Sequence, residues 1–378
     1  MRRIKENFIK LQQQDRRKNI IILTLLICIL LISLFFLPDI SPLFRQNTIS
    51  VIKSIQKNIH NTIPVTHFKN KSNKNETIVI DKPIQSTGCN TPLTLKTKSS
   101  NYVQITDGKE GRKFIIYLPA GYKNNTQHPL IMAFHGYASD AFSLEKFTHF
   151  DDIANNNNVI LIYPEGTTSL VKLQGWNTGL HPTITSNDVL FVSNMLNEIQ
   201  SNLCVNPHQI YATGFSNGGG FVAKLACQLS NRVAAFSSVS GSYVTAFKTC
   251  RALRSLPIME IHGTKDTTVP YVGLEAKNEF AAFTWANRWA ARDKCKPKPI
   301  ITVENKKLNE YQWTNCDGNS SVVHYKIIGE GHSWPHIAFN ERINNTIHQV
   351  NAAHIIWDFF SHHPLPKNVV ESPDTKSI

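Results

Sequence analysis

The sequence predicts an α/β fold in which a mostly parallel β-sheet is covered by helices on both faces. From about residue 101 onward, short apolar runs that end at glycine or proline alternate with segments of helical spacing. The apolar runs are continuous rather than alternating, which is typical of parallel strands buried on both faces. The chain has 378 residues, of which 41% are hydrophobic and 10% aromatic, enough for a substantial core.

The elements of this fold can be assigned in chain order. Apolar runs predict strands at residues 112–119, 130–136, 159–164, 210–213, 234–240, 258–262 and 322–328. Helical spacing predicts helices at residues 188–202, 280–294 and 352–361. The sequence contains no internal repeat.

The net charge of +13 comes mainly from the N-terminal segments. Residues 2–18 hold seven Lys or Arg against two acids, and residues 38–78 hold six against two. The rest of the chain is nearly balanced and shows no basic stripe interleaved with aromatic residues. We therefore expect no nucleic-acid partner.

An apolar segment near the N-terminus predicts a membrane anchor. From Ile20 to Leu37 no residue is charged, and a run of this length just spans a bilayer. The alternative is a cleaved signal peptide followed by secretion. The bulky residues 35–38 (Phe-Phe-Leu-Pro) lack the small side chains of a cleavage site and favour an uncleaved anchor. Because the basic flank precedes the span, the N-terminus is expected in the cytoplasm.

This anchor divides the chain into five predicted segments. Residues 1–18 form a basic cytoplasmic segment, residues 19–37 the transmembrane signal-anchor, and residues 38–100 a polar stem. Residues 101–364 form the α/β domain, and residues 365–378 a loose tail. We expect a single-pass membrane protein whose domain lies outside the cytoplasm, in a periplasm, a lumen or the extracellular space.

The cysteines favour disulfides. Cys28 lies in the predicted span, which leaves an even number of cysteines outside it, as expected on the non-cytoplasmic side. Proximity in sequence favours Cys295–Cys316 and Cys227–Cys250, and Cys89–Cys204 remains. Free buried thiols are the alternative. No C-x-x-C pattern is present, so the spacings do not resemble a metal site.

Residues 214–218 read Gly-Phe-Ser-Asn-Gly, a G-x-S-x-G pattern between a predicted strand and a helix-compatible run. This context is that of a nucleophile elbow, in which the serine is exposed on a sharp turn. The flanking glycines are needed because a Cβ would clash in so tight a bend. Ser216 is therefore a candidate nucleophile; the alternative is a tight turn with no chemistry.

A serine nucleophile needs a base and a group that orients it, and in α/β-hydrolases these follow in the order Ser, Asp or Glu, His. Asp266 follows the strand at residues 258–262, and His332 follows a glycine turn just after the strand at residues 322–328. Both positions fit the carboxyl ends of parallel strands, where such folds place their sites. The rivals are Asp293, Asp317 and a mid-strand Glu260 for the acid, and His336 for the base.

The oxyanion needs two backbone donors. We expect the N–H of Asn217, directly after the nucleophile, and that of Tyr137, in the loop after the strand at residues 130–136. His135 is expected to order this loop and to line the substrate site. Trp176, on a loop after another strand, is a candidate platform for an acyl, aryl or sugar group; its alternative role is to pack the loop.

Six motifs together resemble one known family. They are His135-Gly136, Pro164-Glu165-Gly166, Trp176-Asn177, residues 214–219, His262 to Asp266, and residues 331–335 (Gly-His-Ser-Trp-Pro). In this order they look like the extracellular poly(3-hydroxybutyrate) depolymerase and feruloyl esterase family of α/β-hydrolases. The resemblance covers about residues 101–364. One departure is the oxyanion loop, which reads His-Gly-Tyr where many members have cysteine after the glycine.

The resemblance implies a serine carboxylesterase with Ser216, Asp266 and His332 as the triad. Its substrates would be hydroxyalkanoate esters, feruloyl or acetyl esters of polysaccharide, or small aryl esters. No metal and no organic cofactor is expected. The alternatives are a serine peptidase of the same fold and a catalytically silent hydrolase-fold binding protein.

Overall fold

The computed structural model describes residues 65–67, 79–107, 110–169, 172–244, 250–277, 279–336 and 350–370. The chain divides into two units, Met1–Pro64 and Val65–Ile378, and the described residues all belong to the second. The predicted cytoplasmic segment, signal-anchor and most of the stem and tail therefore lie outside the described residues. Within the described ranges, no helix is both long and apolar enough to cross a bilayer.

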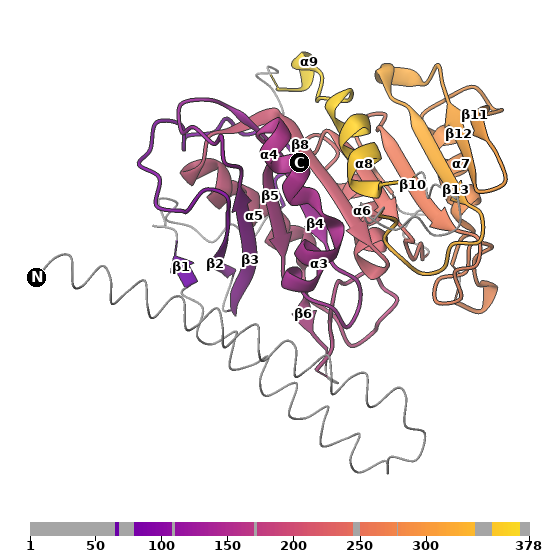
Figure 1. The fold of residues 1–378 in the computed structure, drawn as a ribbon, viewed down its shortest axis with the longest axis horizontal. Coiled ribbons are helices and arrows are strands. Elements are labelled where there is room, and N and C mark those ends of the chain that lie inside the picture. Colours follow the sequence, from indigo (N-terminus) through magenta and orange to yellow (C-terminus); the bar gives the residue numbers. More distant parts are fainter. Residues whose placement is uncertain are drawn as a thin grey trace, which may run out of the picture. The chain divides into compact units, whose positions relative to one another are not determined.

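One large sheet forms the centre of the described unit. Its strands are β1 Val65–His67, β2 Ser99–Asp107, β3 Glu110–Leu118, β4 His128–Phe134, β5 Ile160–Pro164, β8 Val205–Phe215, β9 Ala235–Val239, β10 Ile258–Gly263, β11 Ile300–Glu304, β12 Leu308–Trp313 and β13 Val322–Ile327. Their order in space is β1-β2-β3-β5-β4-β8-β9-β10-β13-β12-β11. In Figure 1 the sheet runs from the indigo β2 and β3 to the orange β11 to β13.

The centre of the sheet is parallel and its flanks are largely antiparallel. Strands β5, β4, β8, β9, β10 and β13 run parallel to one another. On one side β2, β3 and β5 pair antiparallel, and on the other β11, β12 and β13 do. A separate two-stranded ribbon is formed by β6 Thr167–Thr168 and β7 Gln174–Gly175. The parallel centre brings the loops after β4, β8, β10 and β13 to one edge of the sheet.

Helices cover both faces of this sheet. On one face lie α3 Ala141–Thr148, α4 Phe150–Asn157 and α8 Ala352–Ser361. On the other lie α5 Asp188–Asn202, α6 Asn217–Gln228 and α7 Ala282–Arg292. The remaining short helices are η2 Glu275–Lys277, η3 Asp317–Asn319 and α9 Lys367–Val370.

Strand β4 shows how one sequence serves both cores. Leu130 and Met132 belong to the core under α5, α6 and α7, whereas Ile131 and Ala133 belong to the core under α3, α4 and α8. All four side chains are at most 2% exposed. Alternate residues of a strand point to opposite faces, so a strand buried on both faces must be apolar throughout. The prediction of a mostly parallel sheet covered on both faces is confirmed.

The chain makes close contacts with the domain well before residue 101. Cys89 is bonded to Cys204 beside α5, and the N–H of Ile80 donates to Ser193 Oγ on the same helix (3.0 Å). Asp81 Oδ1 accepts from the N–H of Asn231 (2.7 Å). These bonds attach residues 79–98, which the sequence predicted as part of the stem, to the folded unit. The sequence showed no sign of this because a polar segment without periodicity can still bond to a surface.

The structure contains the three predicted disulfides, Cys89–Cys204, Cys227–Cys250 and Cys295–Cys316. The first closes the longest loop, with a sequence separation of 115 residues. Such bonds form and persist in oxidising compartments. They agree with a location outside the cytoplasm.

Candidate active site

Ser216 lies on a sharp turn between β8 and α6. Its backbone angles are φ 57° and ψ −119°, which place a non-glycine residue in a costly region of the backbone map. A Cβ on Gly214 would lie 2.4 Å from the carbonyl oxygen of Gly218, and a Cβ on Gly218 would lie 2.1 Å from that of Phe134. The two glycines therefore let β8, α6 and the end of β4 approach closely enough to hold this turn.

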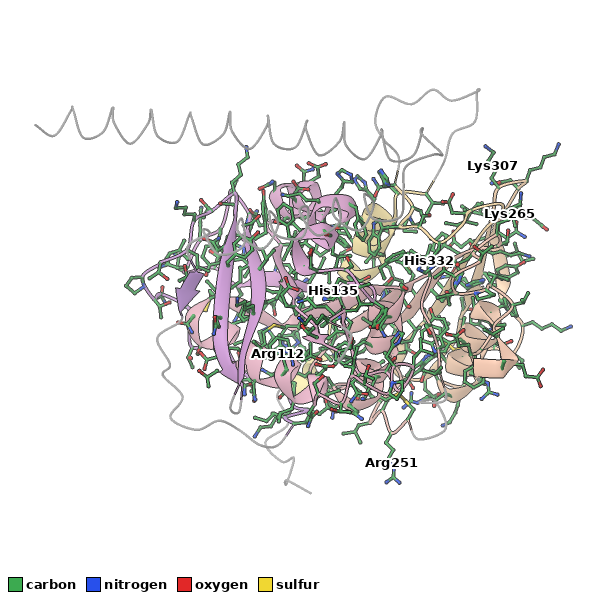
Figure 2. All side chains as sticks on the ribbon, turned by 90° about the horizontal axis from the view of Figure 1, so that it is seen from below. Arg112, His135, Arg251, Lys265, Lys307 and His332 are labelled. Carbon is green, nitrogen blue, oxygen red and sulfur yellow. A yellow bond between two sulfur atoms is a disulfide. The ribbon has the colours of Figure 1, made fainter. Side chains whose placement is uncertain are left out.

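His332 and Asp266 approach Ser216 from two further loops. His332 Nε2 lies 3.0 Å from Ser216 Oγ, and its Nδ1 lies 2.7 Å from Asp266 Oδ2. The loops after β10 and β13 pack tightly, since a Cβ on Gly263 would lie 2.3 Å from the carbonyl oxygen of Glu330. Figure 2 shows His332 toward the tan half of the domain, formed by the later strands. A continuous hydrogen-bonded row thus joins hydroxyl, imidazole and carboxylate.

Asp266 is held as a carboxylate. Its Oδ1 accepts from the N–H of Thr268 (2.9 Å) and of Val269 (2.8 Å). Burial opposes ionisation, but hydrogen bonds from His262 and His332 outweigh it and hold the pKa of Asp266 well below its usual range. An ionised carboxylate only accepts hydrogen bonds, so His332 carries its proton on Nδ1 and leaves Nε2 free to accept from the serine.

The loop after β4 lies against the nucleophile. A Cβ on Gly136 would be 3.3 Å from Ser216 Cβ, so Tyr137 begins directly beside the serine. The backbone N–H groups of Tyr137 and Asn217 donate no hydrogen bond within the described part of the chain. Asn217 is the first residue of α6, where N–H groups lack an intrahelical acceptor and the helix dipole favours negative charge.

His135 orders this loop and does not line a substrate site. It is fully buried, its Nδ1 donates to the carbonyl of Gly136 (2.7 Å), and its Nε2 accepts from the N–H of Gly166 (2.9 Å). Burial lowers the pKa of His135 to about 4, so the ring is neutral. The predicted substrate contact is wrong because the side chain joins two loops from the inside; Figure 2 shows His135 near the pink central strands.

Trp176 is likewise buried and offers no platform to a substrate. It is 0% exposed and stacks on Phe221 with ring centroids 4.9 Å apart. Its Nε1 donates to the carbonyl of His135 (2.9 Å). The packing alternative from the sequence is therefore correct, because the apolar core under α6 takes up the indole.

The rival acids and the rival base lie elsewhere. Asp293 is fully buried, and its carboxylate accepts from the N–H of Leu256 (2.9 Å). Asp317 pairs with Lys294 at the surface (2.8 Å). His336 contacts the carbonyl of Trp334 through Nδ1 (3.3 Å). Within the described residues no His, Cys, Asp and Glu are grouped so as to hold a metal ion.

Two features of the site were missed from the sequence. The Asn217 side chain bonds to the backbone of Trp176, and His262 lies beside Asp266 with its Nε2 3.3 Å from Oδ2. The sequence held a signal for the contact of His262 with Asp266. Residues two apart on a strand share a face, so Glu260 and His262 point the same way, and Asp266 follows only four residues later.

Comparison with known proteins agrees with this geometry. The family model described as Phospholipase/Carboxylesterase matches residues 122–293, a range that contains Ser216 and Asp266. An acetyl xylan esterase from Aspergillus awamori has the same fold, with a TM-score of 0.51 at 16% identity over 69% of this chain and 99% of that one. The chain therefore has an α/β-hydrolase fold and is similar to carboxylesterases in sequence.

Two curated proteins are similar to this chain in sequence. Feruloyl esterase B of Piromyces equi is 31% identical over 240 aligned residues, and the match covers 59% of this chain and 42% of the relative. A bifunctional acetylxylan esterase/xylanase of Neocallimastix patriciarum is 28% identical over 227 aligned residues, and the match covers 59% of this chain and 31% of the relative. The chain therefore spans less than half the length of either protein.

Proposed function

We propose that this chain is a serine carboxylesterase in which Ser216, His332 and Asp266 act as the catalytic triad. The supporting observation is the hydrogen-bonded row from Ser216 Oγ through both nitrogens of His332 to Asp266 Oδ2. A serine hydroxyl is a weak nucleophile unless a neighbouring base takes its proton. The row supplies that base, and the buried carboxylate supplies its orientation.

Acylation follows from the atoms present. Ser216 Oγ attacks the ester carbonyl carbon while its proton passes to His332 Nε2. The imidazolium that forms is stabilised by Asp266, which stays ionised. Collapse of the tetrahedral intermediate breaks the bond to the alcohol oxygen, and His332 Nε2 returns the proton to that leaving group. A water molecule then attacks the acyl-enzyme with His332 again as base, which releases the acid and restores Ser216.

The developing oxyanion would be bound by the N–H groups of Tyr137 and Asn217. Both flank Ser216, one from the loop after β4 and one from the first turn of α6. Donors that are already in place when charge develops lower the barrier without reorganising. His135 supports this arrangement because it fixes the loop that carries Tyr137.

The substrate class we propose is an ester of a hydroxycinnamic or acetic acid with a polysaccharide fragment. This rests on the relatives, whose names are feruloyl esterase and acetylxylan esterase. Hydroxyalkanoate and small aryl esters are the remaining candidates from the motifs.

The test is a panel of substrates given to the wild type and to Ser216→Ala: methyl ferulate, acetylated xylo-oligosaccharide, hydroxybutyrate oligomers, a p-nitrophenyl ester and a peptide. We expect hydrolysis of at least one ester that is lost in Ser216→Ala while the circular dichroism spectrum is kept. Cleavage of the peptide alone would favour a peptidase, and Ser216-independent turnover would contradict the proposal.

We also propose that the segment from Ile20 to Leu37 anchors the protein, with the domain outside the cytoplasm. The uncharged run, the basic flank before it and the three disulfides support this. Alkaline carbonate extraction of membranes, followed by N-terminal sequencing, tests it. A soluble mature chain that begins after Leu37 would contradict the anchor and favour secretion after cleavage.

A further inference from the structure

A row of buried ionisable side chains continues behind Asp266. His262 lies on β10 with Glu260 two residues before it, and His324 lies on the neighbouring β13. All three are at most 1% exposed. Glu260 Oε1 lies 2.9 Å from His262 Nδ1, and Glu260 Oε2 lies 2.5 Å from His324 Nδ1. The triad therefore does not end at its acid.

The acceptors around His262 fix its protonation. Nδ1 faces the Glu260 carboxylate, and Nε2 lies 2.9 Å from the carbonyl oxygen of Val269 and 3.3 Å from Asp266 Oδ2. A carbonyl and a carboxylate only accept hydrogen bonds, so both ring nitrogens must donate, and only the imidazolium can do so. Burial opposes this charge, but the bonds to Asp266 and Glu260 raise the pKa of His262 above its usual value.

This cation touches the oxygen that orients the catalytic base. Asp266 Oδ2 accepts from His332 Nδ1 on one side and faces His262 Nε2 on the other. Oδ1 is held separately by two backbone N–H groups. Four donors thus fix the rotation of the carboxylate, and two of them are imidazoles with opposite tasks: His332 must lose and gain a proton, whereas His262 keeps both of its protons.

We propose that His262 is a positioning residue that fixes the carboxylate of Asp266, with Glu260 as its counter-charge. Its positive charge also offsets part of the negative charge that Asp266 places beside His332. This rests on the proposed function of the triad. A permanent cation on His262 and a positive charge on His332 repel each other across the carboxylate that they share. The charged or titratable groups that face His262, directly or through Glu260 or Asp266, are Glu260, Asp266, Tyr243, Tyr271, His324, Lys326 and His332.

The test compares His262→Gln and Glu260→Gln with His128→Gln as matched control. His128 is also a buried histidine with both ring nitrogens bonded, but it lies at the start of β4, away from the loops that carry the triad. We expect His262→Gln to lower kcat by about 10- to 100-fold, because a small misplacement of the base has such an effect, with KM nearly unchanged. The acid limb of the pH profile of kcat/KM should move to higher pH. Glu260→Gln should also lower kcat, but by less, because it weakens the bond that holds His262 against Asp266.

If His262 had a merely structural role, all three variants would lose thermal stability, and the pH profile of kcat/KM of the protein that remains folded would not change. That result, or a wild-type kcat and profile in both His262→Gln and Glu260→Gln, would overturn the proposal. Nitrogen NMR of labelled histidine in the wild type needs no variant: one ring should keep both protons at about pH 8.5, well above an ordinary histidine pKa. Its absence would overturn the proposal as well. If wild type shows no Ser216-dependent hydrolysis, the proposed function fails instead.

Discussion

The side-chain amide of Asn217 bonds to both the backbone N–H and the backbone carbonyl of Trp176. The N–H of Trp176 donates to Asn217 Oδ1 (2.8 Å), and Asn217 Nδ2 lies 3.3 Å from the carbonyl oxygen of Trp176. The residue after the nucleophile thus fixes the loop that carries the indole, and the indole in turn donates to the carbonyl of His135 in the oxyanion loop. Hydrogen bonds therefore connect the start of α6, the loop of Trp176 and the oxyanion loop around Ser216.

Replacing Trp176 with Phe tests this buried role. The aromatic contact with Phe221 is kept, but the carbonyl of His135 loses its donor, which should lower the free energy of unfolding by about 1–3 kcal/mol. Chemical denaturation measures this loss, and KM for the ester should stay near the wild-type value. Trp313→Phe is the control: Trp313 is equally buried, and its Nε1 has no hydrogen-bond partner in the described part of the chain. A large rise in KM at unchanged stability would instead support a substrate platform.

Asp266→Asn tests the orienting acid. The amide can donate to His332 and so hold the ring with its proton on the wrong nitrogen, which should lower kcat by about 10⁴-fold, as in a serine protease triad. Steady-state kinetics at saturating ester measures this. Asp317→Asn is the control, because that carboxylate pairs only with Lys294 at the surface in the described structure. An Asp266→Asn enzyme within tenfold of wild type would rule out the assigned role.

How much of the site the sequence could predict depends on how local each signal is. The elbow can be recognised from the sequence because a Cβ on Gly214 would clash with Gly218, only four residues further on. Chain order predicted Asp266 and His332 as partners of the serine, and in the structure His332 bonds to both Ser216 and Asp266. Their catalytic roles remain predictions. Trp176 could not be placed from its polar neighbours, since its burial depends on Phe221, 45 positions along the chain.

The same reason explains the missed elements. Strand β2 begins Ser-Ser-Asn, and the hairpin of β11 and β12 is rich in Lys, Asn and Glu, so neither carries the continuous apolar run that marked the central strands. Both lie toward the flanks of the sheet, where one face can meet solvent and the pattern weakens. The predicted strand at residues 210–213 is the apolar half of β8, whose first residues are more polar.

The disulfides should differ in their effect on stability. In the chain-entropy account a crosslink stabilises by restricting the unfolded chain, more so for longer loops. Removing Cys89–Cys204, with a separation of 115, should cost about 5 kcal/mol, and removing Cys227–Cys250, with a separation of 23, about 3 kcal/mol. Unfolding of the two Cys→Ser double variants under non-reducing conditions measures both. Equal or reversed losses would show that native-state strain or residual structure dominates.

Glu165 should make stability fall as the pH rises. Burial raises the pKa of Glu165 to about 7, and its Oε2, 3.9 Å from His135 Nε2, has no hydrogen-bond partner in the described residues. Between its ordinary value and about pH 7 the folded protein holds a proton that the unfolded chain releases. The stability this confers is complete below the ordinary value and is lost as the pH rises through 7.

Glu165→Gln should therefore match the wild type near pH 4 but unfold with a free energy higher by about 3 kcal/mol at pH 8. The difference between variant and wild type isolates Glu165 from His135, whose lowered pKa acts in the opposite direction. Glu304→Gln, an exposed change on β11, is the control. A difference that does not depend on pH would show that folding does not raise the pKa of Glu165.

The most direct measurement of the central claim is covalent labelling with a fluorophosphonate, read by intact mass and by peptide mapping. We expect one adduct on the peptide that contains Ser216, none on Ser216→Ala, and much slower labelling of His332→Ala, because the probe reports a serine activated by its base. A wild-type protein that stays unlabelled, or an adduct on another residue that persists in Ser216→Ala, would contradict the assignment of Ser216 as the nucleophile.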